Sequence, residues 1–279
     1  FKIKHAQKRL ELKLKYPMLK SMNDKPMKDT IQAIPYLSVV RVEGGDAGDF
    51  LQSQLSADIA ALEPGDSTPA CYCTPKGKVL GLLLVGRDDT GYLLAGSNEL
   101  LPGILQRLKM FVMRSEVTFS DTAAVAVSSP SGPAFSCSGQ AAAMEDPEAW
   151  RAGELLAGIT WLNAKSTDSF IPQMLGFENI GAVSFQKGCY PGQEIVARAR
   201  YLGKVKRKPL IATVEGGPAP GTGTKVRVRR GEQWSDAVVV DSARLDENRT
   251  VMFTVAPGEP ESAADEVEIE GRTYRCATT

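Results

Sequence analysis

The chain has 279 residues, with 33 Lys and Arg balanced by 33 Asp and Glu, and 43% of its residues are hydrophobic. These proportions are typical of a globular protein with a sizeable core, and they exclude the disordered and fibrous classes. No apolar run approaches the ~20 residues of a membrane span, and the five scattered cysteines do not form a disulfide framework. We therefore expect a cytoplasmic protein without a membrane partner.

Residues 1–30 differ in charge from the remainder of the chain. They hold nine Lys and Arg against three Asp and Glu, so the other 249 residues carry a formal charge of −6. No long apolar face forms in this stretch, and we expect an added or disordered basic tail that lies outside the fold. The alternative is a basic arm that contacts nucleic acid or a membrane surface.

From residue 36 the apolar pattern predicts a mixture of strands and helices. A strand-like run covers 36–42, and apolar residues at helical spacing predict a helix over 46–62. The next expected elements are strands over 70–73, 79–85 and 91–95, a helix over 97–108 and a strand over 116–119. Strands and helices do not alternate regularly in this order, which favours an α+β fold over a doubly wound one.

The middle of the chain changes in composition. Between 128 and 143 it is rich in Ser, Gly, Pro and Ala, which predicts a surface loop and a break between two subdomains near 125–145. Asp146 and Pro147 then predict the cap and first turn of a helix around 150–156. A strand is expected over 159–162.

Past residue 208 the sequence consists of short alternating runs separated by turns. This texture is typical of a small antiparallel β-barrel. The runs cover 210–214, 224–228, 237–242, 251–255, 266–270 and 273–276. We therefore expect an α+β region over 31–205 and a C-terminal β-barrel over 206–279.

The turn around Cys189 is the most unusual local sequence. Gly188, Pro191 and Gly192 surround the cysteine, and Pro191 or Gly192 is suited to open a helix. A cysteine just before a helix N-terminus, with Lys187 two residues upstream, lies in a setting that favours thiolate over thiol. Cys189 is therefore a candidate reactive or metal-binding residue. The alternative is a buried, inert cysteine in a glycine-rich turn.

Several other kinds of site are excluded or disfavoured. His5 is the only histidine, which argues against Ser-His-Asp and Cys-His catalysis and against a zinc site built on imidazoles. Cys71 and Cys73 would lie on one face of a strand, but nothing nearby completes a set of metal ligands, so we expect a buried strand there. No phosphate loop or dinucleotide fingerprint is present.

A basic cluster follows the cysteine turn. The stretch 187–208 has a net charge of +6 within an otherwise acidic body, and Glu194 is its one acidic residue. Such a cluster is suited to a polyanion, for example a polycarboxylate tail or an RNA backbone, and the alternative is a solvated helix and hinge. Its basic residues are Lys187, Arg198, Arg200, Lys204, Lys206, Arg207 and Lys208.

The eight residues Lys-Gly-Cys-Tyr-Pro-Gly-Gln-Glu at 187–194 closely resemble the signature of the folate-binding YgfZ family. The segments 50–58, 76–79 and 170–173 also resemble parts of that family, and the resemblance covers roughly residues 36–279. It implies a role for the signature residues Lys187, Gly188, Cys189, Tyr190, Gly192, Gln193 and Glu194.

Members of this family are implicated in iron–sulfur cluster assembly or repair, and their fold is similar to that of the glycine-cleavage T-protein, an aminomethyltransferase. The resemblance implies α+β subdomains around a central channel that binds tetrahydrofolate or a one-carbon derivative of it. It also implies that the anionic folate tail or a partner contacts Arg198 and at least one of Lys204, Lys206 and Arg207.

The same comparison argues against the reaction of the T-protein. Where that enzyme has paired aspartates, this sequence has Gly81 and Leu82, so no carboxylate remains there to orient or accept a proton. We therefore expect a folate-binding accessory protein rather than a classical enzyme. The alternatives are a one-carbon transferase and an RNA-binding or tRNA-modification-linked protein, although the acidic body makes nucleic acid a poor direct ligand.

Without a histidine base, the setting of Cys189 suits metal or cluster ligation, persulfide handling or redox exchange better than acyl transfer. One cysteine cannot hold an iron–sulfur cluster alone. The expected arrangement is a transient cluster shared with an iron–sulfur protein or an assembly factor.

Overall fold

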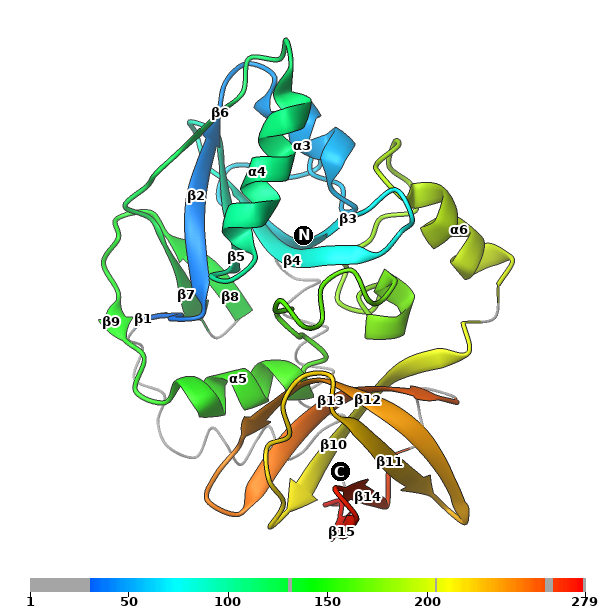
Figure 1. The fold of residues 1–279 in the computed structure, drawn as a ribbon. Coiled ribbons are helices and arrows are strands. Elements are labelled where there is room, and N and C mark those ends of the chain that lie inside the picture. The colour runs from blue at the N-terminus through cyan, green and yellow to red at the C-terminus, as the bar shows by residue number, and fades with distance from the viewer. Residues whose placement is uncertain (1–30, 130–131, 204, 259–262, 278–279) are drawn as a thin grey trace.

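The computed structural model describes residues 31–129, 132–203, 205–258 and 263–277 (Figure 1). The predicted basic tail over 1–30 lies outside the described residues, as does Lys204. The described part has three sheets and four α-helices, and the α+β fold class is confirmed. None of the described helices is long and apolar enough to cross a membrane.

The first sheet has five strands in the order β3-β4-β5-β2-β6. Helices α3 and α4 pack on one face of it, where they share a core with β2, β3 and β4 (Figure 1). The predicted strands of this region are confirmed. The elements are β2 (Leu37–Glu43), α3 (Ala47–Gln54), β3 (Ser67–Cys73), β4 (Val79–Arg87), β5 (Tyr92–Ser97), α4 (Leu101–Val112) and β6 (Thr118–Ser120).

Helix α3 is shorter than the sequence predicts. It ends at Gln54, because Leu55 has an extended backbone and pairs with Tyr72 of β3 in an isolated bridge. Ile59 and Leu62 are buried as their helical spacing suggested, but they lie in turns. The expected helix over 46–62 was therefore too long, since pairing with the sheet overrides the local periodicity.

The surface loop expected over 128–143 was wrong, because this segment forms part of the second sheet. Its order is β8-β7-β1-β9, and the segment contributes the end of β7 and all of β8 and β9. At Gly86 of β4 a Cβ atom would lie 2.6 Å from the ring of Phe135, so glycine permits β8 to pack closely on the first sheet. The strands are β1 (Gln32–Ala33), β7 (Val125–Ser129), β8 (Gly132–Ser136) and β9 (Ala142–Ala143).

Helix α5 (Pro147–Leu156) begins as predicted, because the Asp146 carboxylate accepts a hydrogen bond from the backbone N–H of Ala149 at 2.9 Å. The strand expected over 159–162 is absent from the described sheets. The N–H of Ile159 donates instead to the carbonyl of Glu154 at 2.8 Å, in a turn that closes the helix.

The third sheet contains the six strands expected in the C-terminal part of the chain. Their order is β10-β13-β12-β11-β14-β15. The outer strands meet at a bridge between Val214 and Cys276, beside a hydrogen bond of 2.8 Å from Ala277 N to Thr213 O. Beyond this bridge and hydrogen bond, the described residues form no ladder between β10 and β15. The sheet is therefore only partly closed between these two strands. The strands are β10 (Arg207–Glu215), β11 (Lys225–Arg230), β12 (Gln233–Arg244), β13 (Arg249–Pro257), β14 (Glu266–Ile269) and β15 (Arg272–Arg275).

One apolar core connects the segment around Cys189 to both of the larger sheets. It contains Cys71 and Leu82 from the first sheet, Val196 from the helix after the cysteine turn, and Val240 and Phe253 from the third sheet. Burying these side chains together positions the turn relative to the rest of the molecule.

Candidate functional site

Cys189 lies in an exposed turn that leads into helix α6 (Gln193–Tyr201). The helix after the cysteine is as predicted, and Gly192 precedes it in a left-handed conformation with φ of +82°. No atom beyond the neighbouring residues lies within 4 Å of where a Cβ at Gly188 would be, so the backbone beside the cysteine is uncrowded. The thiol is therefore accessible from solvent.

The side chain of Lys187 is buried beneath this turn. Its ammonium donates hydrogen bonds to the carbonyl oxygens of Gln52 and, at 2.5 Å, of Leu55. It also lies 5.2 Å from the centroid of the Tyr190 ring. These carbonyls belong to the last turn of α3 and to the residue after it, where a helix leaves carbonyls without internal partners. Lys187 therefore ties the signature to the end of α3.

Burial lowers the pKa of the Lys187 ammonium from 10.5 to about 8, and electrostatic interaction with the nearby Asp58 and Cys189 opposes this shift. The sequence suggested Lys187 as a cation that acts on Cys189. In the structure its hydrogen bonds go to the backbone of α3, so its main role is to position the turn.

The connection between β3 and β4 packs against the start of α6. A Cβ at Gly192 would lie 2.7 Å from the Cα of Gly77 and would collide with the carbonyl oxygen of Thr74. A Cβ at Gly77, where φ is +71°, would lie 3.0 Å from the Cβ of Ile195. Both glycines are therefore needed for backbone conformation and for close approach.

Two further segments noted in the sequence also contact this region. The Nε2 of Gln173 donates to the carbonyl of Val196 in α6 at 2.8 Å, and the N–H of Val79 donates to the carbonyl of Phe170 at 2.8 Å. The hydroxyl of Ser56 donates to the carbonyl of Ala182 at 2.5 Å. The structure therefore brings together all four segments that resemble the family.

Three oxygen atoms near the turn are buried and make no hydrogen bond within the described chain. They are the hydroxyl of Tyr190, Oε1 of Gln173 and Oε1 of Glu178. Burial raises the pKa of the Tyr190 phenol, and electrostatic interaction with the nearby Cys73, Cys71 and Glu178 adds to the effect. Buried polar atoms without partners are uncommon and are typical of places where a ligand or water binds.

Glu178 and Gln173 were not predicted as site residues. Gln173 was noted only as part of the segment that leads to the signature, and no local pattern marks Glu178. The second carboxylate oxygen of Glu178 accepts from Arg200 at 2.8 Å, and that guanidinium lies 5.0 Å from the Phe185 ring centroid. Arg200 already belonged to the predicted basic cluster, so a search for its acidic partner could have identified Glu178.

The described basic residues proposed to bind an anionic tail lie on α6 and at the start of β10. Arg198 is 62% exposed and pairs with Glu194 at 2.9 Å, one helical turn away. Arg207 begins β10, and Lys206 immediately precedes it.

Cys71 and Cys73 lie in a buried strand, as predicted, and both contribute to the core on one face of β3 while Tyr72 faces the other core. A hydrogen bond that the Cys73 thiol donates to Cys71, together with burial, raises the pKa of that thiol. In the described ranges no group of three or more His, Cys, Asp or Glu could hold a metal ion.

No protein-family model matches the chain. An uncharacterized protein of Haemophilus influenzae is 29% identical over 226 residues, which cover 74% of this chain and 81% of that protein. The tRNA-modifying protein YgfZ of Escherichia coli O157:H7 is 24% identical over 276 residues and covers 81% of this chain and 85% of the relative.

The fold is shared with a solved structure. The glycine cleavage system aminomethyltransferase T from Bartonella henselae matches 89% of this chain and 84% of its own, with a TM-score of 0.66 and 13% sequence identity. The chain thus has the aminomethyltransferase T-protein fold. Among proteins with known names, its sequence is similar to the YgfZ proteins.

The contact between Gly192 and the β3–β4 turn can be tested by adding a methyl group. Gly192→Ala should lower the free energy of unfolding by at least ~1–3 kcal/mol, because a left-handed backbone is strained for alanine and the Cβ meets Thr74 and Gly77. Gly188→Ala is the matched control, since that position is open, and it should change stability by less than ~0.5 kcal/mol. Urea unfolding measures both, and equal losses would contradict the close packing.

The burial of Lys187 predicts a pH dependence of stability. The folded lysine releases its proton near pH 8 and the unfolded lysine near 10.5, so the unfolded state binds more protons between these values and the free energy of unfolding rises with pH. Lys187→Met should remove this rise. It should also cost ~1–3 kcal/mol at pH 7, because two carbonyls lose their donor.

The control is Lys76→Met, because Lys76 is exposed in the β3–β4 turn. Urea unfolding at several pH values between 7 and 10.5 compares the three proteins. The same pH slope in Lys187→Met and wild type would show that Lys187 is not buried as described.

Proposed function

We propose that this protein is a folate-binding accessory factor for iron–sulfur cluster assembly or repair, and that it acts through Cys189. The observation that supports the proposal most is the presentation of this cysteine. Its side chain is exposed, while Lys187 on one side and Gly192 on the other fix the turn to the first sheet and α3. A thiol on a rigid, exposed turn is suited to contact with a partner protein.

The chemistry proposed for Cys189 is ligation of an iron atom in a cluster that is carried by a partner. Thiolate is the ligand that iron–sulfur clusters use most. The described residues offer no group of three or more candidate ligands, so the remaining ligands would come from the partner. In this proposal the cluster is cargo, and Cys189 contributes one bond during assembly or repair.

The proposed folate site lies beside the turn. The unpartnered oxygens of Tyr190, Gln173 and Glu178 fit a ligand with several N–H groups, which a pterin ring has. These residues would hold the ring, and Arg198 with Lys204, Lys206 or Arg207 would contact the glutamate tail. A bound one-carbon derivative of tetrahydrofolate could supply a one-carbon unit and tetrahydrofolate itself could accept one, whereas these side chains would bind and orient the ring.

The fold also supports a second candidate, aminomethyl transfer. The residues of β4 argue against aminomethyl transfer. Leu82 is 2% exposed within the main core, and a Cβ at Gly81 would lie 2.6 Å from the Cδ1 of Ile104. An aspartate at either position would meet apolar atoms, so the strand is built without the proton acceptor that this chemistry uses.

The name of the Escherichia coli relative supports a third candidate, a protein linked to tRNA modification. The basic residues of α6 could serve direct RNA contact. However, Arg198 and Arg200 each pair with a carboxylate, which reduces the charge available for phosphates. We therefore place an iron–sulfur role ahead of direct RNA binding.

Folate binding is expected to depend on the buried polar oxygens. Tetrahydrofolate should bind the purified protein with measurable heat, and at 100 times its dissociation constant it should stabilise the fold by ~2.7 kcal/mol. Glu178→Gln should weaken binding, because an anionic acceptor becomes neutral. Asp89→Asn is the control, in an exposed turn of the first sheet. Absence of heat at millimolar folate would refute the site, and aminomethyl transfer at enzymatic rates would favour the second candidate.

Cys189→Ser should leave the free energy of unfolding and folate affinity nearly unchanged, since the side chain is exposed, but should abolish support of iron–sulfur enzymes in cells that depend on this protein. Cys137→Ser is the matched control, because Cys137 is also exposed but lies in the second sheet region. Activity of a reporter iron–sulfur enzyme measures the effect. Full rescue by Cys189→Ser would disprove the role of the thiol.

A further inference from the structure

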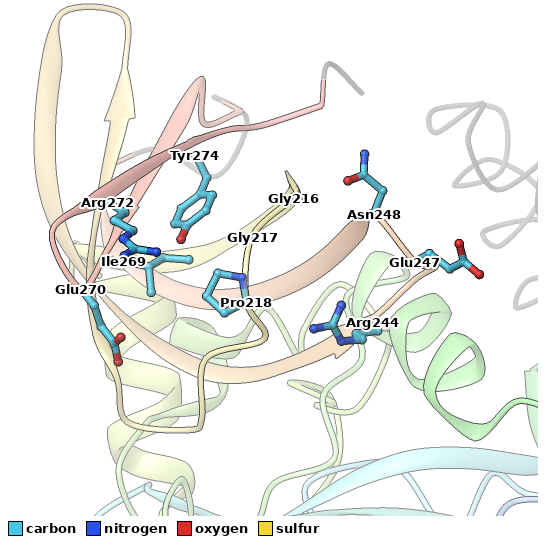
Figure 2. A pocket seen from close by; sticks show the side chains of 10 residues that line it. All are labelled: Gly216, Gly217, Pro218, Arg244, Glu247, Asn248, Ile269, Glu270, Arg272 and Tyr274. Atoms are coloured by element: carbon cyan, nitrogen blue, oxygen red, sulfur yellow. The ribbon is translucent and has the colours of Figure 1, made fainter.

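A pocket opens at one end of the third sheet, where β10 and β15 separate (Figure 2). Its volume of about 650 Å³ is that of a small-molecule site. Three turns build it: the chain after β10, the connection between β12 and β13, and the turn between β14 and β15. Nothing in the proposed function uses this pocket.

The pocket exists because the seam between the outer strands stops pairing. Beyond the bridge between Val214 and Cys276, the N–H of Gly216 donates to the carbonyl of Asn248 at 2.7 Å, which continues the pairing of β10 with β13. Gly217 lies beside the ring of Tyr274, where a Cβ would be 3.4 Å from that ring. The pocket opens next to this contact.

The β14–β15 turn places an arginine on the pocket side. Glu270 and Gly271 both have positive φ, of +51° and +77°, as in the two-residue turns that fit the twist of a hairpin. Ile269 therefore pairs directly with Arg272. Because side chains alternate along a strand, Arg272 and Tyr274 share one face of β15, and Figure 2 shows both at the pocket.

The pocket offers hydrogen-bond donors that the rest of the described chain does not use. Arg272 on one side and Arg244, the last residue of β12, on the other present guanidinium groups, and Figure 2 shows Pro218 between them. The side chains of Asn248 and Tyr274 add an amide and a phenol. None of these four side chains bonds another described residue, whereas Arg229 of β11 pairs with Glu266 on the same sheet.

The acidic residues of the pocket lie at its edge. Figure 2 shows the carboxylate of Glu247 extending away from the two guanidinium groups, and Glu270 in the turn at the rim. Pro218 and Ile269 are the apolar aliphatic residues of the lining, and Pro218 lies between the arginines in Figure 2. Cationic groups at two sides of this partly apolar surface match a ligand with an anionic group at each end.

We propose that this pocket binds a small molecule with two anionic groups, carboxylates or phosphates, joined by a flat apolar spacer. Arg244 and Arg272 each bind one anionic group, and the ring of Tyr274 lies along the spacer. The site is separate from the turn of Cys189. β10 starts shortly after α6 and ends at the pocket, and its nine residues span ~30 Å.

Calorimetry with the full chain tests the proposal, using 1,4-benzenedicarboxylate and 1,4-phenylenebisphosphonate as probes and benzoate as the single-anion control. At least one two-anion probe should bind at least ~10-fold more tightly than benzoate, a difference of ~1.4 kcal/mol. The tighter of the two identifies the natural anionic group as carboxylate or phosphate. Arg244→Gln and Arg272→Gln should each weaken binding ~10-fold or more.

The matched control is Arg275→Gln. Arg275 is exposed on the same strand, three residues from Arg272, and therefore points to the opposite face. It should leave affinity within ~2-fold of wild type, as should Cys189→Ser, which separates this site from the proposed function. Thermal unfolding checks that each variant folds.

Three results would overturn the proposal. The first is the absence of binding by both probes at ~10 mM, about ten times the dissociation constant of a weak ligand that binds at ~1 mM. The second is benzoate binding as tightly as the two-anion probes. The third is equal loss of affinity in Arg275→Gln and the two pocket variants, which would mean nonspecific attraction to positive charge.

Discussion

The buried ammonium of Lys187 is the interaction on which the site depends. It supplies donors to carbonyls at the end of α3 that the helix itself leaves without partners. Burying the charge is costly, as its lowered pKa shows, and the hydrogen bonds and the neighbouring Tyr190 ring offset part of that cost. The exposed thiol two residues later gains its fixed position from this contact. A surface lysine at the same place in the chain would leave the turn free to move.

The charged pairs of the molecule differ greatly in what they stabilise. Arg151 of α5 bonds Asp241 of β12, whose side chain is 6% exposed, so this pair fixes the helix to the third sheet. Burial raises the pKa of the Asp241 carboxyl, and Arg151 opposes that shift. By contrast, the pair of Glu194 and Arg198 is exposed on α6, where such pairs contribute ~0.3–0.5 kcal/mol. The helix that carries the signature is therefore held by its core residue Val196 and by its first turn.

Sequence alone predicted the elements whose pattern is local. The strands of the third sheet alternate clearly, as in β11, where the buried Val226 and Val228 alternate with basic residues that are exposed or half-buried. The end of α3 was wrong because apolar spacing continued through Ile59 after the chain had left the helix. The strands within 128–143 were missed because Ser, Gly and Pro are common both in loops and in short edge strands.

The candidate site was predicted only in part, because only some of its features follow from local sequence patterns. The glycines around Cys189 indicated an open turn, and the chain has one. The partners of Lys187 are backbone carbonyls 135 and 132 residues away, and every residue has a carbonyl, so no side-chain pattern could identify them. Glu178 likewise belongs to the site because it lies near Tyr190 in the fold, which no local sequence pattern indicates. Local patterns locate a turn, whereas the fold decides what surrounds it.

The contacts of the signature also determine when it can form during folding. Its partners come from α3, from the β3–β4 turn and, through the shared core, from β13 near residue 253. A nascent chain that ends soon after residue 203 has made the cysteine but not the sheet that completes its core. Closing such long loops costs entropy before any contact stabilises them. The thiol therefore reaches its final environment only when nearly the whole chain has been synthesised, and the eight signature residues transplanted into another protein would lack the scaffold that presents it.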